Sequence, residues 1–344
     1  SVFSLLLTAS LISTFMAASD AAPRPKRLSV TKVETSMESE GRPVQEFTLT
    51  NSKGLRATII SHGGIVTSLE VPDRDGKFAS VVLKHTTPEG FLVNGPYFNC
   101  ITGRYANRIA KGKFSIDGTE YTLATNNDPN HLHGGDKGLN QRHWNAAAVE
   151  ETDRVGVQLS YLSPDGEEGY PGNLKSVVTY WLTEQNEFTI EYSATTDKPT
   201  IINLTNHNYW NLAGNGNTKQ TILDHELTLN CDKYLPVDEN LIPTGKLAKV
   251  ADTAMDFRSA HKIGSRIDQV EGGYDHCYVI NNGGKSLQLA ATVHESKSGR
   301  VMTIHTSEPG IQLYTGNFLD ATDTCGNYVR NGGFCLEAEE FPDS

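Results

Sequence analysis

The amino-acid sequence predicts an all-β protein, built as a large antiparallel β-sandwich. Many short segments alternate apolar and polar residues, which is the period of a half-buried strand. Turn signals separate these segments, and the chain contains 31 Gly and 14 Pro among its 344 residues. Helical periodicity is nearly absent, and one short helix is expected at residues 259–270. These observations favour many short strands joined by turns over a helical or mixed architecture.

The expected strands begin near residue 47 and continue to the end of the chain. The clearest hairpin joins residues 114–116 to 121–123 across Asp117-Gly118. Asp-Gly accepts the positive φ angles of a type I′ turn, and apolar residues alternate on both sides of it. The other expected strands cover residues 47–49, 55–59, 155–161, 178–182, 188–192, 201–207, 310–314 and 334–338, and one more pair starts at 287–289 and turns back at 297–299.

The N-terminal residues differ in character from the rest of the chain. They carry no charge before Asp20, are rich in Leu and Ala, and end in small residues. This pattern predicts a secretory signal peptide at residues 1–22, followed by a linker at 23–40. A membrane anchor is the alternative, because the uncharged run approaches spanning length, but its many Ser and Thr favour the signal peptide. Residues 41–344 are then a single domain of a secreted or periplasmic protein rather than a cytoplasmic one.

Charge and cysteine content exclude several classes of function. Thirty Lys and Arg against 41 Asp and Glu give a formal net charge of −11, which argues against binding to nucleic acids or to anionic membranes. The five Cys form no C-x-x-C pair, so neither a structural zinc site nor a thioredoxin-type motif is expected. Cys325 and Cys335 could form a disulfide in an oxidising compartment, but five small buried thiols are the favoured interpretation.

Three of the expected strands carry polar residues opposite their apolar ones. Alternation places His207 opposite the apolar face of segment 201–207, and it does the same for Gln312 and for Glu337 in their strands. If these strands share a sheet, the three side chains line one polar face. Periodicity alone fits the solvent side of a sheet equally well.

The loops distinguish a site from a plain solvent face. Polar and aromatic motifs occur in a fixed order along the chain. The motifs are NCITGRYANRIAKG at 99–112, NHLHGG at 130–135, YPGNL at 170–174, TNHNYWNL at 205–212, GYDH at 273–276, GNFL at 316–319 and FPDS at 341–344. Together they resemble the aldose 1-epimerase (galactose mutarotase) family from about residue 45 to the end. Each motif alone is weak, but their order and spacing make a chance match implausible.

The resemblance implies a galactose mutarotase-like β-sandwich with an open sugar cleft. It implies His207 as general acid and Glu337 as general base. It implies a small-molecule sugar as the binding partner and no metal or organic cofactor, and it leaves the oligomeric state open. The implied sugar-binding residues are Asn107, Arg108, His133, Asp275 and Gln312.

The chemistry of anomer exchange suits these residue types. A base must remove the proton of the C1 hydroxyl while an acid protonates the ring oxygen O5, so that the ring opens. The free aldehyde then rotates, and ring closure on the other face reverses both transfers. One carboxylate and one imidazole can do this near neutral pH because the environment can tune both groups.

The sequence departs from the family pattern near its end. Glu339 and Glu340 occupy positions where a Gln and often a His are expected. Extra acidic groups would raise the pKa of Glu337 if they lie close to it, or they would point into solvent. Family members continue beyond the Phe-Pro-Asp-Ser motif for about one strand pair, so a chain that stops at Ser344 is expected to be a fragment with an exposed sheet edge.

Alternatives remain open for the function and for individual residues. A hexose-phosphate mutarotase, a non-catalytic sugar-binding protein and a glycoside hydrolase using Asp275 with Glu337 are the competing functions. His131 and His133 have a spacing that could ligate a metal, although two His are weak evidence. Arg104 is expected to pair with a carboxylate. Trp144 and Trp210 are expected in the core, and the glycosylation sequon at 203–205 is expected to be unused.

Overall fold

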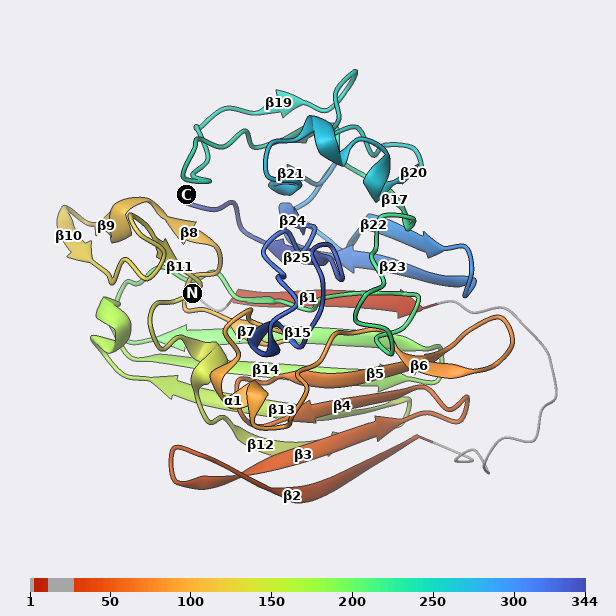
Figure 1. Cartoon of the computed structure of the whole chain (residues 1–344). Coiled ribbons are helices and arrows are strands. Elements are labelled where there is room, and N and C mark those ends of the chain that lie inside the picture. Colours follow the sequence, from red (N-terminus) through yellow and green to blue (C-terminus); the bar gives the residue numbers. More distant parts are fainter. Residues whose placement is uncertain (1–2, 12–27) are drawn as a thin grey trace.

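A computed structural model shows the chain and describes residues 3–11 and 28–344 (Figure 1). Within these residues the regular elements are strands apart from one four-residue helix and six 3₁₀ turns, which confirms the predicted all-β fold. Three larger sheets form its body, one of nine strands and two of five, and three two-stranded ladders accompany them.

The largest sheet is antiparallel throughout and crosses the whole molecule (Figure 1). Its centre contains the hairpins predicted from alternating residues, whose period of two matches the pleat. In spatial order its strands are β12 (Asn145–Glu150), β13 (Arg154–Ser163), β14 (Leu174–Thr183), β15 (Glu187–Thr196), β1 (Phe3–Leu11), β23 (Arg300–Thr306), β22 (Gln288–Glu295), β17 (Glu226–Leu229) and β20 (His261–Lys262).

A five-stranded sheet packs face to face on β12, β13 and β14 and makes the sandwich (Figure 1). Phe47 and Ile59 on this sheet belong to the same continuous core as Leu159 and Tyr180 on the large sheet, and all four are fully buried. Burying each such side chain contributes about 1.5–3 kcal/mol. The strands of this sheet are β2 (Ser29–Ser39), β3 (Arg42–Thr50), β4 (Arg56–Ile60), β5 (Val66–Pro72) and β6 (Phe78–Ser80).

The second five-stranded sheet positions much of the candidate site. Gln312 on one strand lies opposite Glu337 on the next, as alternation predicted for a shared sheet. Asp275 belongs to the neighbouring strand and pairs with Tyr314. The strands, in spatial order, are β19 (Ala248–Lys249), β18 (Lys233–Tyr234), β21 (Asp275–Val279), β24 (Gly310–Tyr314) and β25 (Cys335–Glu339).

The remaining elements are short. Asp117 and Gly118 have φ angles of 50° and 79°, so the hairpin between β9 and β10 turns as predicted. The prediction of one short helix at 259–270 was wrong, because this segment forms two separate 3₁₀ turns. The ladders pair β7 (Ile101–Thr102) with β16 (Thr205–Asn206), β8 (Arg108–Ile109) with β11 (His131–Leu132), and β9 (Lys113–Ile116) with β10 (Thr119–Thr122); the helical turns are α1 (Gly90–Val93), η1 (Ala110–Gly112), η2 (Leu139–Gln141), η3 (Glu167–Gly169), η4 (Ile263–Ser265), η5 (Ile267–Gln269) and η6 (Asp323–Cys325).

The segment before His207 differs from the prediction. Only Thr205–Asn206 form a strand, and it pairs with β7 rather than with β24 or β25. Asn203 instead exchanges backbone hydrogen bonds with the loop after β7: its N–H donates to Arg104 and its carbonyl accepts from Ala106. The backbone groups of this segment are therefore satisfied by a loop, which alternation of side chains does not reveal.

The beginning of the chain bears on the predicted signal peptide. Phe3–Leu11 form β1, which pairs with β15 on one edge and with β23 on the other. Residues 12–22 lie outside the described residues, so the signal peptide stays a prediction. Among the helices of the described residues, none is long and apolar enough to cross a membrane.

Candidate active site

A cleft of about 290 Å³ opens above β21, β24 and β25. Its size is at the lower end for small-molecule sites and suits one sugar ring. Every residue that the sequence singled out for the site lines this cleft, although the segments that supply them are far apart in the chain. These residues are Asn107, Arg108, His133, His207, Asp275, Gln312 and Glu337.

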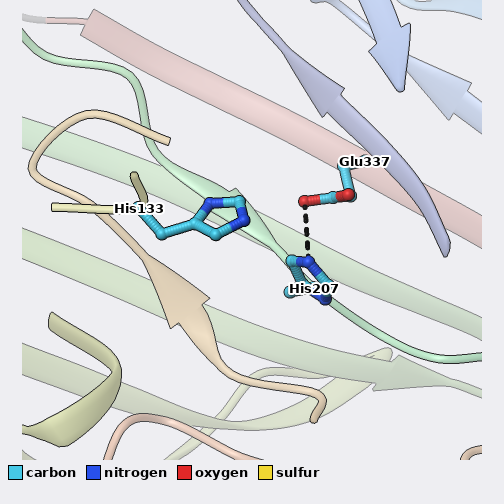
Figure 2. Close-up of side chains that lie close together, drawn as sticks. All are labelled: His133, His207 and Glu337. Atoms are coloured by element: carbon cyan, nitrogen blue, oxygen red, sulfur yellow. Dashed lines mark ion pairs between the residues drawn. The ribbon is translucent and has the colours of Figure 1, made fainter. Parts of the chain in front are cut away.

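His207 and Glu337 face each other at the floor of the cleft (Figure 2). Nε2 of His207 lies 3.6 Å from Oε2 of Glu337, and both residues are almost fully buried. Glu337 is held by β25, and the backbone of His207 bonds to Cys100 and Asn99. An acid and a base from separate segments are thus fixed side by side.

Burial determines how many protons the pair carries. It lowers the pKa of His207 to about 4 and raises the pKa of Glu337 well above its ordinary value, with the carboxyl groups of Glu339 and Asp275 adding to the second shift. Below about pH 4 both groups are protonated, and above the raised pKa of Glu337 neither is. Between these limits the pair holds one proton, so it can donate one proton and accept another.

His133 is set up as a hydrogen-bond donor. Its Nδ1 accepts a hydrogen bond of 3.1 Å from the backbone N–H of Asn107. Burial, His207 and Arg108 push the pKa of His133 well below its ordinary value, so the ring is neutral. A neutral imidazole that accepts at Nδ1 carries its proton on Nε2. His133 therefore offers an N–H group beside His207, and the two rings meet edge to face at 5.0 Å (Figure 2).

This tautomer bears on metal binding. His133, His207 and Glu337 offer three potential ligand atoms within 4.8 Å of one another (Figure 2). A metal at Nε2 of His133 would require the proton to leave that atom, while Nδ1 is already occupied by Asn107. The arrangement fits a sugar hydroxyl better than a cation. His131 bonds through both nitrogens to Ala124 and Tyr170, so it does not join His133 as a ligand pair.

Arg108, Asp275 and Gln312 form a polar wall at one side of the cleft. Nη1 of Arg108 lies 3.9 Å from Oδ2 of Asp275, and Nε2 of Gln312 donates to Oδ1 of Asp275 at 2.6 Å. Nε of Arg108 donates to Asn127 at 3.1 Å. Oε1 of Gln312 is buried without a hydrogen-bond partner. Fixed donors and acceptors of this kind match the hydroxyl groups of a sugar.

Asp275→Asn tests this wall. The charge-assisted contacts of Asp275 become neutral ones, worth about 0.5–1.5 instead of 1.5–3 kcal/mol, so KM for the sugar should rise by roughly tenfold while kcat changes little. Steady-state kinetics and the melting temperature are measured on one preparation. Asp224→Asn, which removes an exposed partner of Lys262, is the control. A lowered melting temperature with unchanged KM would show that Asp275 is only structural.

Several residues near the site have roles different from those expected. Arg104 bonds to Ser163 and to the carbonyl groups of 163, 164, 171 and 172, not to a carboxylate, so that expectation was wrong. The Cys325–Cys335 disulfide is not formed, because all five Cys are free thiols. Trp144 and Trp210 are in the core, as predicted. Asn203 is buried and bonded to backbone carbonyls, which agrees with an unused sequon.

Sequence reasoning missed three residues that contact the predicted site residues. The ring of Tyr97 lies 4.8 Å from that of His133, and Asn127 orients Arg108. Sγ of Cys335 lies 3.6 Å from Nδ1 of His207; burial raises the pKa of this thiol, so it stays protonated. Cys335 and Glu337 are two residues apart on β25 and so share one face, which was the available signal for Cys335.

Comparison with known proteins finds related sequences and a related fold. A family model described as aldose 1-epimerase matches residues 45–344. Human galactose mutarotase is 46% identical over 312 residues, covering 90% of this chain and 89% of its own length. Aldose 1-epimerase of Escherichia coli K12 is 37% identical over 316 residues and covers 90% of each chain. A crystal structure of galactose 1-epimerase from Lactobacillus acidophilus superposes with a TM-score of 0.80 at 28% identity, covering 92% of this chain and 91% of that one.

Proposed function

Because the chain belongs to the aldose 1-epimerase family, we propose that it interconverts the α and β anomers of free hexoses such as galactose and glucose. The observation that carries this proposal is the buried pair of His207 and Glu337, 3.6 Å apart at the floor of a sugar-sized cleft. Between the lowered pKa of His207 and the raised pKa of Glu337 the pair holds one proton. Anomer exchange needs such a pair, because each ring opening or closure takes one proton from the sugar and gives one to it.

In the proposed reaction Glu337 takes the proton of the C1 hydroxyl as the C1–O5 bond breaks. The protonated imidazole of His207 gives its proton to O5, which becomes the C5 hydroxyl of the open aldehyde. Rotation about C1–C2 exposes the other face of the carbonyl. On closure Glu337 gives its proton to the carbonyl oxygen at C1, His207 takes the proton of the C5 hydroxyl as O5 attacks C1, and the enzyme ends as it began.

The binding of sugar prepares the pair for this step. In the empty cleft burial favours the neutral arrangement, with the proton on Glu337 rather than on His207. Hydroxyl groups that donate to the carboxylate favour its ionised form, and the proton then belongs on the imidazole. We propose that Arg108, His133 and Gln312 hold the hydroxyl groups that set this orientation, with Asn107 beside them.

The competing functions fit the geometry less well. Arg108 is the only basic residue, Lys or Arg, among the described residues that line the cleft, and it already contacts Asp275 and Asn127. Within this lining the cleft therefore offers no unpaired Lys or Arg side chain to bind the phosphate of a sugar phosphate. Asp275 is held by Arg108 and Gln312, which argues against its use as the second carboxylate of a glycoside hydrolase. A purely sugar-binding protein has no need for the buried acid–base pair.

Polarimetry separates these functions. Fresh α-D-galactose and α-D-glucose should approach equilibrium rotation faster with the protein, and galactose 6-phosphate should respond less. Methyl α-D-galactoside, whose ring cannot open without losing the methyl group, and a non-reducing disaccharide should show no change. Loss of rotation with either glycoside would instead indicate hydrolysis.

Export through residues 1–22 is also proposed, on the uncharged leader alone. It competes with the pairing of Phe3–Leu11 in the large sheet, because a removed leader cannot supply β1. Intact-mass analysis of the protein from its source decides between the two: a mature chain that starts near residue 23 supports export, and a retained segment 3–11 contradicts it.

A further inference from the structure

The second carboxyl group on β25 has no part in the reaction described above. Glu339 is fully buried, which is rare for an acidic side chain. Residues two apart on a strand point to the same face, so Glu339 lies about 7 Å further along the face that carries Glu337. Glu339 is not among the residues that line the cleft, so it acts from behind that surface.

Glu339 is tied to the cleft through Asn107. Nδ2 of Asn107 donates to Oε1 of Glu339 at 2.9 Å, while Oδ1 of Asn107 accepts from the backbone N–H of Arg108 at 2.9 Å. These two bonds fix which end of the amide is the donor. The backbone N–H of the same residue bonds to His133, so Asn107 connects Glu339 to the donor histidine of the site.

Three buried side-chain oxygens at and near Glu339 have no hydrogen-bond donor. Oε2 of Glu339, Oε2 of Glu337 and Oε1 of Gln312 are all buried without a hydrogen-bond partner. Two buried carboxylates side by side cannot both stay ionised at low cost, whereas a proton on one of them relieves the repulsion. Burial accordingly raises the pKa of Glu339 to about 8, although the bond from Asn107 opposes the shift.

We propose that Glu339 is a positioning residue of this reaction. It fixes the amide of Asn107, and as a second buried carboxyl group it lets the His207–Glu337 pair keep its single proton up to a higher pH. This inference rests on the proposed anomer exchange. Charged and titratable groups face Glu339 or Glu337 from several elements. They are Glu337 and Cys335 on β25, Asp275 and Cys277 on β21, Arg108 on β8, Tyr105 and Cys100 near β7, Glu308 before β24, His207 and Tyr209 after β16, and His133 after β11.

The substitution Glu339→Gln removes the charge and keeps the shape. The new amide oxygen can still accept from Asn107, so KM should change by less than about twofold. With the acid of Glu339 removed and that of Asp275 retained, Glu337 should lose its proton at a lower pH. The fall in kcat at high pH should therefore begin about one pH unit lower. Glu340→Gln is the matched control: it changes the same charge one residue later, on an exposed side chain, and should leave the limb in place.

Two readouts make the outcome decisive. Mutarotation rates from pH 5 to 10 are compared for the wild type, Glu339→Gln and Glu340→Gln, and the carboxyl ¹³C shifts of the Glu side chains are titrated in the same three proteins. A lower midpoint for Glu337 in Glu339→Gln alone supports the inference. Unchanged midpoints and limbs with an active wild type overturn it and leave the proposed function intact, whereas a wild type without activity overturns the proposed function itself.

Discussion

Glu337→Gln should slow mutarotation by roughly 10²–10⁴-fold, which is the usual contribution of a positioned acid–base group. The amide keeps the volume of Glu337 on β25 and stays opposite Gln312, but it cannot take the proton of the C1 hydroxyl. The loss should appear in kcat, because the sugar contacts of Arg108 and Asp275 remain. Progress curves of optical rotation at saturating galactose give this value.

The same substitution should leave the fold intact. The pKa of Glu337 is raised in the folded protein, so the unfolded chain ionises first as the pH rises above about 4.5. The protein therefore loses stability as the pH rises from about 4.5 to the raised pKa of Glu337, and this loss persists above it. Removing the group should leave the melting temperature at pH 7 unchanged or higher. A folded Glu337→Gln protein with near-normal kcat would remove Glu337 from the mechanism.

His207→Ala should cause a loss of similar size, with a specific chemical rescue. The change removes the acid that protonates O5 and leaves a space between Glu337 and the ring of Tyr209. Added imidazole should enter this space and restore part of the rate in proportion to its concentration. Rescue is measured against the rate that imidazole alone produces in buffer.

A second His–Glu pair in the chain provides the control. His294 on β22 and Glu226 on β17 lie 3.0 Å apart on a partly exposed surface, outside the cleft. His294→Ala and Glu226→Gln should leave the rate unchanged. If His207→Ala retains the rate of these controls, or if imidazole has no effect beyond its action in buffer, His207 is not the acid.

The alternation of side chains was enough to predict much of this fold. It identified β24 and β25 and the face of Gln312 and Glu337, because a strand sends successive side chains to opposite sides. It gave neither the order of strands nor the layers, since these depend on contacts between residues far apart in the chain. The large sheet joins segment 187–196 to segment 300–306 through β1, and no local pattern contains that information.

The sequence predicted which residues belong to the candidate site, but it did not predict how they are arranged in space. The motifs and the family resemblance named the seven residues, whereas the position of His207 depends on a segment bonded to the loop at Arg104 and Ala106. Sequence left open whether Glu339 and Glu340 approach Glu337 or face solvent. The structure buries the first and exposes the second, because they lie on opposite faces of the chain at the end of β25.

The central claim is that His207 and Glu337 work as one acid–base unit. The most direct test is a double-mutant cycle, in which kcat for α-D-galactose is measured for the wild type, Glu337→Gln, His207→Ala and the double variant. Residues that share one proton transfer cycle lose their effect together, so the double variant should be within a few-fold of the slower single variant. Losses that multiply, with the double variant slower by the product of the two single effects, would contradict the claim.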